Sequence, residues 1–435
     1  MNRVRQIIAA GRRFLLLNPP VEDIAAYGLW NTPLGLLRVA AGLRASEKDL
    51  TFFDLLDDPG LRLPPPSIPP EERPDGRHGF WKTAIPKPPE LHMVPRRYHR
   101  FGATDDHLRT LLADLPHPDA VFIATGMTYW YRTVLRTAEL VREHFPAVPV
   151  IAGGTAARLI PERFEADGLI VERGDLFPGI DLRVVSDLTA RYTAYPIELV
   201  RGCPYRCRYC ASSIFHADTG LNDPAVQAES LRAWATATGR RDAVFFDDAL
   251  LWRKGEHLRK FLSLFDPGLF RFHIPNGLHL REVDEDIAQL LSRYRFSPLR
   301  FGFETGGDRF DSKKEGVHLA DTLAILHRAG YRPRDLGVYL LCGMPGQTLR
   351  EVEDAVDLVV AAGGRPYLNE YSPVPGTPLF DEHLAESARD ISAEPLWQNN
   401  SLSAYRSPVF TPSAMRRLKD RLASVYRDQD RERFS

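Results

Sequence analysis

The chain has 435 residues, of which 44% are hydrophobic and 26% charged, and its formal net charge is −1. This composition is typical of a globular protein of two or three domains, and the near-neutral charge excludes an overall basic field that would attract nucleic acid or an anionic membrane. No apolar run is long enough to span a membrane, and the N-terminal residues lack the apolar core of a signal peptide, so we expect a cytoplasmic protein.

Residues 1–180 alternate short apolar runs with amphipathic stretches, which predicts a first domain of alternating strands and helices. The segment Pro33–Ala45 predicts a helix opened by proline. The alternation indicates an α/β domain with a doubly wound, flavodoxin-like parallel sheet, and such sheets bind ligands at the carboxyl ends of their strands. The predicted strands are Phe14–Asn18, Leu50–Leu56, Ala120–Gly126, Val148–Gly154 and Leu169–Asp175.

A proline-rich insertion, Leu63–Pro95, interrupts this pattern with ten prolines. Two interpretations stay open. The insertion is a structureless surface loop, as long loops often are, or it is an ordered arm packed on another surface. Its four large apolar side chains favour the ordered arm. They are Phe80, Trp81, Ile85 and Met93.

From Tyr195 a second, more regular alternation begins. Residues 190–382 predict six strands joined by helices, which is the pattern of a partial (β/α)6 TIM-type barrel. One of these helices begins with a capping box, Thr348 and Glu351. Residues 383–435 form a small extension with one amphipathic helix. The predicted strands are Pro196–Val200, Ala243–Leu250, Phe270–Asn276, Leu299–Thr305, Asp335–Gly343 and Pro366–Val374.

Three of the four cysteines lie within eight residues, as Cys203, Cys207 and Cys210 in a C-x₃-C-x₂-C pattern. Three thiolates after a strand suit a [4Fe–4S] cluster with one iron left open for a small molecule. A zinc ion closed by His216 is the alternative that this spacing leaves open. Cys342 lies in an apolar run, where we expect a small core residue.

The segment "RGCPYRCRYC", with Tyr209 before the third cysteine, resembles the signature of the radical S-adenosylmethionine (radical SAM) superfamily. The resemblance implies that the three cysteines hold the cluster and that the amino and carboxylate groups of S-adenosylmethionine chelate the open iron. It also implies reductive cleavage to methionine and a 5′-deoxyadenosyl radical. The implied partners are a small or mid-sized substrate and an external electron donor such as flavodoxin or ferredoxin.

The resemblance continues at the ends of the later predicted strands. There it implies cofactor contacts: acidic residues for the amino group of methionine, polar residues for the ribose or carboxylate, and a glycine turn near adenine. Each carboxylate alone also fits a helix cap or a structural ion pair. The implied S-adenosylmethionine contacts are Tyr209, Asp247, Asp248, Asn276, Arg281, Glu304 and Gly343.

The first domain resembles the cobalamin-binding domain that precedes the barrel in one branch of this superfamily. The resemblance includes the glycine pair Gly153 and Gly154, which it implies as cofactor-binding residues. The cobalt-ligating D-x-H-x-x-G loop corresponds to Asp23–Gly28, with Ala25 in the place of the histidine. Either cobalamin binds without that histidine, with the aromatic segment Tyr129–Tyr131 near its lower face, or the fold is kept and the cofactor lost.

Three functions follow as hypotheses. The first is a radical SAM enzyme that transfers a methyl group when cobalamin is bound, or performs oxidation, cyclisation or rearrangement without it. The second is a tRNA methylthiotransferase-like modifier, against which stand the lack of a second cysteine triad and of a basic RNA-binding module. The third is a non-catalytic iron–sulfur protein. We therefore expect neither a nucleic acid nor a membrane as partner.

Overall fold

The computed structural model describes residues 3–30, 32–71, 73, 76–305 and 318–431. The chain divides into two compact units. The first unit comprises Met1–Tyr195 and Arg232–Arg240, and the second unit comprises the remaining residues, including the C-terminal extension that the sequence pattern set apart.

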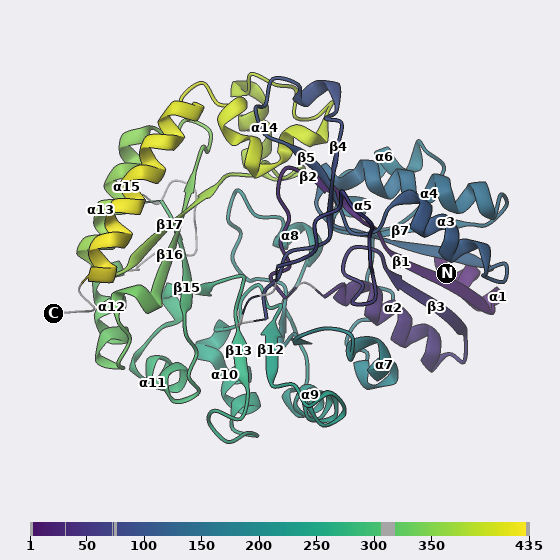
Figure 1. Cartoon of the computed structure of the whole chain (residues 1–435). Coiled ribbons are helices and arrows are strands. Elements are labelled where there is room, and N and C mark those ends of the chain that lie inside the picture. Colours follow the sequence, from purple (N-terminus) through teal and green to yellow (C-terminus); the bar gives the residue numbers. More distant parts are fainter. Residues whose placement is uncertain (1–2, 31, 72, 74–75, 306–317, 432–435) are drawn as a thin grey trace. The chain divides into compact units, whose positions relative to one another are not determined.

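The first unit is built on a five-stranded sheet with the order β3-β1-β6-β7-β8, in which every pair of neighbours is parallel. Helix α2 lies on one face of this sheet, and α3 and α4 lie on the other (Figure 1). The predicted doubly wound sheet is thereby confirmed. The helices are α1 (Arg3–Ala10), α2 (Leu34–Ala45), α3 (Asp105–Ala113), α4 (Tyr131–His144), α5 (Thr155–Leu159), α6 (Pro161–Glu165) and α7 (Ser186–Thr189), and the strands are β1 (Arg13–Asn18), β2 (Val21–Asp23), β3 (Asp49–Asp54), β4 (Lys82–Ile85), β5 (Tyr98–Phe101), β6 (Ala120–Thr125), β7 (Val150–Gly154) and β8 (Ile170–Glu172).

The central strands of this sheet are apolar on both faces because helices cover both. Leu15, Leu16 and Leu17 of β1 are all fully buried. Each buried leucine contributes roughly 1.5–3 kcal/mol of transfer free energy. Continuous apolar runs of this kind are what a sheet covered on both sides requires, which is why the sequence pattern identified the strands.

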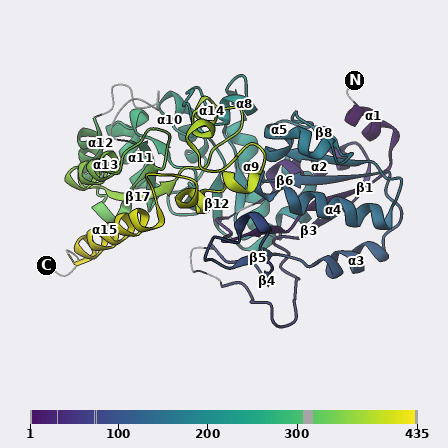
Figure 2. The same ribbon diagram turned by 90° about the horizontal axis from the view of Figure 1, so that it is seen from above.

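The proline-rich insertion is an ordered arm over the part of it that the structure describes. Its strand β4 pairs antiparallel with β5, which also pairs with β2, and long loops flank β4 (Figure 2). Phe80 is 4% exposed and packs with Val21 and Phe101, whereas Met93 is 55% exposed. Because β2 directly follows β1, the insertion folds beside the carboxyl ends of the parallel strands.

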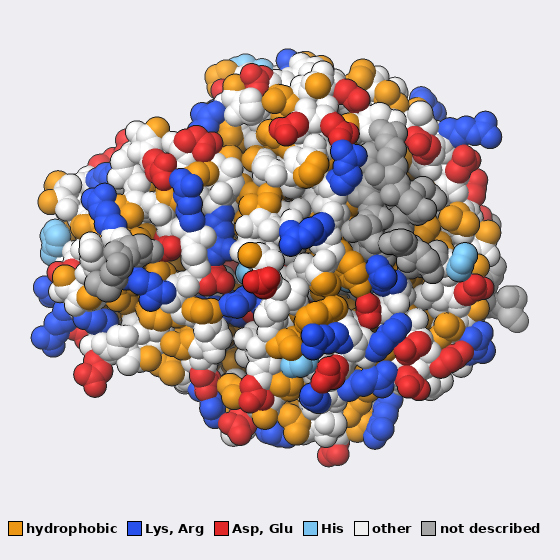
Figure 3. All heavy atoms as spheres, turned by 180° about the vertical axis from the view of Figure 1, so that it is seen from behind, with side chains coloured by type: hydrophobic (Ala, Val, Ile, Leu, Met, Phe, Trp, Pro, Cys, Tyr) orange, Lys and Arg blue, Asp and Glu red, His pale blue; other side chains and the backbone are white. Residues whose placement is uncertain are grey.

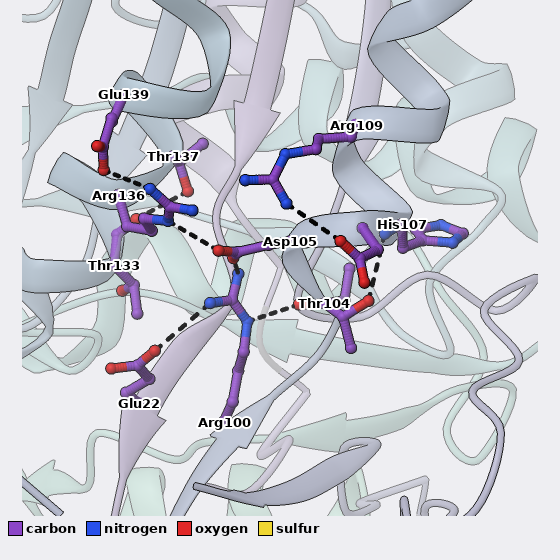
Figure 4. Close-up of polar contacts among 12 residues, drawn as sticks. Glu22, Arg100, Thr104, Asp105, His107, Arg109, Thr133, Arg136, Thr137 and Glu139 are labelled. Atoms are coloured by element: carbon purple, nitrogen blue, oxygen red, sulfur yellow. Dashed lines mark hydrogen bonds and ion pairs between the residues drawn. The ribbon is translucent and has the colours of Figure 1, made fainter. Parts of the chain in front are cut away.

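A partly buried ionic network ties this small sheet to the helices of the first unit (Figure 4). The Arg100 guanidinium donates to the backbone oxygen of Ala103 at 2.8 Å and pairs with Glu22 at 3.4 Å and Asp105 at 2.8 Å. Asp105 also accepts from Nε of Arg136 at 2.7 Å. The network therefore joins β2, β5, α3 and α4.

The second unit contains the predicted barrel. Its strands are β9 (Tyr195–Ile197, starting at the unit boundary), β10 (Val200–Arg201), β11 (Gly220–Leu221), β12 (Asp242–Phe245), β13 (Arg271–His273), β14 (Leu278–His279), β15 (Leu299–Glu304), β16 (Leu336–Cys342) and β17 (Arg365–Glu370), and its helices are α8 (Ser212–Phe215), α9 (Pro224–Thr238, ending in the first unit), α10 (Trp252–Leu262), α11 (Glu285–Arg293), α12 (Leu319–Arg328), α13 (Leu349–Ala361), α14 (Pro378–Glu386) and α15 (Pro412–Arg431).

The barrel strands form two hydrogen-bonded groups, β13-β12-β9 and β14-β15-β16-β17. The predicted third strand, Phe270–Asn276, is shorter in the structure, as β13, and a further short strand that was not predicted, β14, follows it. β13 pairs with β12, whereas β14 pairs with β15. The break between β13 and β14 falls at Pro275, which has no amide hydrogen to donate, and at Gly277, whose φ is +78°. Strand order otherwise follows chain order, so the expected partial barrel is confirmed.

The last helices follow their sequence patterns closely. Thr348 and Glu351 form the predicted capping box, with the amide of Glu351 donating to Oγ1 of Thr348 at 3.2 Å. Met415 and Leu418 of α15 are buried against Cys342 of β16. Among the described helices, none combines the length and the apolar character that crossing a membrane requires.

Candidate active site

The three clustered cysteines lie on one loop that begins after β10 in the second unit. Antiparallel pairing of β10 with β11 closes the base of this loop. Gly202 opens it with φ +78°, and a side chain there would lie 2.8 Å from Cβ of His216, so only glycine allows this tight start. Cys207 is buried, Cys203 and Cys210 are half-buried, and none of them forms a disulfide.

The donor set fits an iron–sulfur cluster, because three thiols on one short loop supply the soft anionic ligands that iron–sulfur clusters require. Among the described residues, no group of three or more His, Cys, Asp and Glu side chains is arranged at metal-holding distances. The assignment of Cys203, Cys207 and Cys210 as ligands therefore rests on their spacing, their loop and the family match given below.

The end of β12 lies directly beside the cysteine loop. The amide of Ser212 donates to Sγ of Cys210 at 3.5 Å, and its hydroxyl donates to Asp248 at 2.6 Å. Ser212 thus connects the third cysteine to the strand end at which the resemblance implies contacts. Ser212 was not predicted from the sequence, although its position two residues after the last cysteine is a usable signal.

Asp247 is 2% exposed and is fastened by one oxygen only. Its Oδ1 accepts from the amides of Leu199 at 3.0 Å and Val200 at 2.6 Å, while its Oδ2 has no hydrogen-bond partner among the described residues. Burial raises the pKa of this carboxyl well above its usual value. An orphaned carboxylate oxygen at a strand end is a ready acceptor for a cationic group, and the amino group of S-adenosylmethionine is one.

Asn276 contacts the chain that follows β12, whereas Arg281 contacts the cysteine loop. The side-chain amide of Asn276 donates to the backbone oxygens of Phe246 and Asp247, both at 3.3 Å. The exposed Arg281 guanidinium lies 5.1 Å from the ring centre of Tyr205 in the cysteine loop. Its contact in this structure is therefore a cation–π contact with the loop, and a role toward ribose or carboxylate stays a prediction.

Tyr205 is held from a second side by Glu282, which the sequence argument did not single out. The phenol donates to Oε1 of Glu282 at 2.6 Å, and the amide of Lys254 donates to the other oxygen at 3.1 Å. Burial and this hydrogen bond raise the pKa of Tyr205. Lys254 has a left-handed backbone, φ +53°, so Glu282 also stabilises a strained turn.

The remaining predicted contacts lie at the ends of β15 and β16. Glu304 is buried, with φ +65°. Gly343 has φ +86°, and Gln347, which the sequence argument missed, accepts from its amide at 2.9 Å and fixes the turn. Tyr209 packs against the buried residues Met344, Tyr371 and Leu379, which gives the cysteine loop an apolar wall.

Cys342 is a core residue, as expected. It is fully buried, and burial raises the pKa of its thiol to about 12. Such a thiol stays protonated at neutral pH and is a poor metal ligand.

In the first unit, the glycine pair lies at the carboxyl end of β7. Gly154 has φ +120°, and a Cβ there would lie 2.4 Å from the backbone oxygen of Thr125. The edge is therefore bare backbone, which suits a large planar ligand. The loop after β2 carries Ala25 in place of a histidine, and Asp23 is occupied by the indole N–H of Trp130, which donates to it at 2.7 Å. No imidazole is available from this loop to bind cobalt.

The family model for the radical SAM superfamily matches residues 197–359. These residues contain the cysteine loop and the barrel strands through β16. Residues 197–359 form a radical SAM domain, and the match confirms the predicted resemblance to this superfamily, which uses a [4Fe–4S] cluster and S-adenosylmethionine.

Two solved structures of the radical S-adenosylmethionine methyltransferase TsrM from Kitasatospora setae share the fold. Their TM-scores are 0.60 and 0.59 at 14% identity, and each alignment covers 86% of this chain and 78% or 76% of TsrM. One holds cobalamin and a [4Fe–4S] cluster, and the other holds tryptophan substrate and the analogue aza-SAM. At this identity the likeness concerns the fold alone.

A curated relative is the tRNA-2-methylthio-N(6)-dimethylallyladenosine synthase of Sulfurihydrogenibium sp. (strain YO3AOP1). It is 23% identical over 263 residues, which cover 55% of this chain and 55% of that protein. The chain thus spans about half the length of this relative.

Proposed function

We propose that this chain is a cobalamin-dependent radical SAM methyltransferase that acts on a small organic substrate. The observation that carries the proposal is the fold shared with TsrM over 86% of the chain, a span that includes both units. When bound, the cluster supplies the electron that cleaves S-adenosylmethionine, and cobalamin carries the methyl group.

The residues of the second unit have two tasks in this proposal. The thiolates of Cys203, Cys207 and Cys210 hold the cluster and leave one iron open. Asp247 accepts the amino group of S-adenosylmethionine on its unpartnered oxygen. A buried, charge-assisted hydrogen bond of this kind contributes about 1.5–3 kcal/mol.

The first unit supports cobalamin through its shape and not through a cobalt ligand. The bare glycine edge at Gly153 and Gly154 gives a planar macrocycle close access to the backbone. Thr125 stiffens this edge, because its hydroxyl donates to the oxygen of Gly153 at 3.1 Å and accepts from the amide of Ala157 at 3.0 Å. With Ala25 in the loop, we propose that the lower face of the cobalamin lacks a histidine from this chain segment.

The proposal is tested on protein expressed without oxygen and with hydroxocobalamin supplied. We expect a stoichiometric corrinoid, about four irons per chain, and S-adenosylmethionine turnover with a strong reductant or with reduced flavodoxin or ferredoxin. A full cluster without S-adenosylmethionine turnover would contradict the enzymatic part. Turnover without any bound corrinoid would leave a radical SAM enzyme that oxidises, cyclises or rearranges its substrate.

A tRNA methylthiotransferase is the second candidate, because the curated relative is a methylthio synthase. Two observations weigh against it. The four cysteines of the chain supply only one triad. Acidic and basic side chains are interspersed over the face shown in Figure 3, and no broad basic surface stands out on it. A mobility shift with tRNA at moderate salt would favour this candidate over the first.

A further inference from the structure

The first unit contains a cavity of about 560 Å³ beneath the proline-rich insertion. Its wall comes from five separate segments: the chain around Trp30, the turn after β3, the insertion, the segment 191–194 that precedes β9, and Arg240. A volume of this size is within the range of small-molecule sites. The insertion is therefore more than a surface arm, because it forms part of the wall of this cavity.

Two polar contacts hold the cavity in shape. On the floor, the buried Tyr192 phenol donates to Oδ2 of the buried Asp54 at 2.8 Å. At the roof, Nε2 of His78 lies 2.8 Å from Asp57 and ties the insertion to the turn after β3. The His78 ring also packs edge-on against Phe80, at 5.7 Å between ring centres. A site fastened on both sides needs little reordering when a ligand enters.

The charges on the wall favour an anion. Arg62, Arg77, Arg191 and Arg240 all line the cavity. Arg73 lines the cavity as well, so among the described residues five arginines face two acidic ones, Asp57 and Asp58. Asp57 pairs with His78, whereas Arg62 and Arg240 donate to backbone oxygens, which carry no formal charge. The arginine charges therefore outweigh the acidic ones, and planar guanidinium groups match the geometry of carboxylate and phosphate oxygens.

Two aromatic side chains add a preference for a flat ring. Trp30 and Trp81 are half-buried and both line the cavity. The Arg77 guanidinium lies 5.8 Å from the ring centre of Trp30, so charge and ring surface are adjacent. Aromatic faces of this kind stack on planar groups and gain affinity without requiring a particular hydrogen-bond pattern.

We propose that this cavity is a binding site for a small organic anion that carries a phosphate or carboxylate on a flat ring. The site is separate from the cysteine loop, which belongs to the second unit. It is also separate from the glycine edge, because it opens beside β3 at the margin of the sheet, whereas the glycine edge belongs to β7, two strands beyond β1. It does not depend on the proposed methyl transfer.

The test uses the full chain and titration calorimetry with phenyl phosphate, benzoate and inorganic phosphate as probes. We expect saturable one-site binding of at least one ring-bearing probe, about tenfold tighter than inorganic phosphate because the ring adds stacking. Quenching of tryptophan fluorescence should accompany binding and should shrink in Trp30→Phe. Phosphate and carboxylate sources are distinguished by which of the two ring-bearing probes binds.

Variants locate the binding. Arg77→Gln and Arg191→Gln should each weaken the tighter probe about tenfold, since each removes one charge-assisted contact. The matched control is Arg173→Gln, an exposed arginine of the same unit that pairs with Glu165 away from the cavity wall. Its affinity should equal that of the wild type.

Four results would overturn the proposal. The first two are no saturable binding of any probe up to about 5 mM and inorganic phosphate binding as tightly as the ring-bearing probes. The other two are a loss of affinity in the control variant equal to that in the cavity variants, and displacement of the probe by hydroxocobalamin or S-adenosylmethionine. The last result would assign the cavity to one of those cofactors. Far-ultraviolet circular dichroism of each variant identifies any loss of affinity that comes from unfolding. Arg77→Lys and Arg191→Lys, which keep the positive charge, should retain part of the affinity that the glutamine variants lose.

Discussion

Replacing Asp54 by asparagine should change how the stability of the chain depends on pH. Asp54 ends β3 and is 2% exposed. Its Oδ1 accepts from Nδ2 of Asn18 at 2.7 Å and from the amides of Leu56 and Asp57, and its Oδ2 accepts from the phenol of Tyr192. Burial raises the pKa of this carboxyl from 3.8 to about 6, with the nearby charge of Asp57 adding to the rise and the hydrogen bonds opposing it.

The sign of the effect follows from the direction of the shift. The folded state holds the proton of Asp54 at pH values where the unfolded chain has already released it, so the contribution to stability is largest below about pH 4 and is lost as the pH rises through about 6. A shift of this size corresponds to about 3 kcal/mol in full. Between pH 5 and pH 7 the free energy of unfolding should fall by about 1.3 kcal/mol on account of this one group.

Urea denaturation of the wild type and of Asp54→Asn, at pH 5 and at pH 7, measures the effect. The asparagine keeps one oxygen for the donors now shared by Oδ1, and its amide can donate to the Tyr192 oxygen. The variant's free energy of unfolding minus that of the wild type should be about 1.3 kcal/mol larger at pH 7 than at pH 5.

Asp106→Asn is the control, because the Asp106 side chain is 94% exposed. It should leave the pH dependence of the free energy of unfolding as in the wild type. A difference between Asp54→Asn and the wild type that is equal at both pH values, or that is larger at pH 5, would refute the assignment of a raised pKa to Asp54.

Three further changes separate cluster binding, cosubstrate binding and backbone strain. Cys207→Ala should remove the iron content and the visible absorbance of the anaerobic protein, whereas the matched Cys342→Ala should keep both and lose about 1 kcal/mol of stability from a small core cavity. Asp247→Asn should weaken S-adenosylmethionine binding about 10- to 100-fold in equilibrium dialysis, because the acceptor of the amino group loses its charge. The asparagine keeps one oxygen that accepts from the two backbone amides, so the fold should be retained. An unchanged affinity would contradict the proposed role of Asp247. Gly154→Ala should lower the melting temperature more than Gly239→Ala does, since both have positive φ but only position 154 meets a backbone oxygen, 2.4 Å away; equal shifts would show that the close approach carries no cost.

Local patterns were enough to predict the elements and the cysteine loop. The apolar run Phe14–Asn18 and its neighbours became the parallel strands of the first sheet, and the capping box at Thr348 opens α13 where it was expected. These features depend on residues close together in the chain. The spacing of such residues indicates which face of a helix or strand packs against the core and where a helix begins. The three cysteines are of the same kind, because a ligand set within eight positions needs only one loop.

The surroundings of the site depended on contacts between distant residues. Ser212 reaches Asp248 across 36 positions, and Tyr205 reaches Glu282 across 77. No sequence pattern predicts either pair, because the sequence does not show whether a serine or a glutamate faces solvent or a distant buried side chain. The sequence therefore did not reveal Ser212 and Glu282, which fasten the cysteine loop through residues distant in the chain.

The first unit shows most clearly which features the sequence predicts and which features depend on the tertiary structure. Residue order alone was sufficient to predict an alternating α/β sheet, a proline-rich arm with apolar side chains and a loop without its histidine. That the arm lines a cavity, and that Asp54 sits beneath Tyr192 from 138 positions away, emerged only when the chain was folded. The physical reason is that periodicity records which face of an element is buried, whereas burial of a charge and enclosure of a space depend on which distant segment covers it.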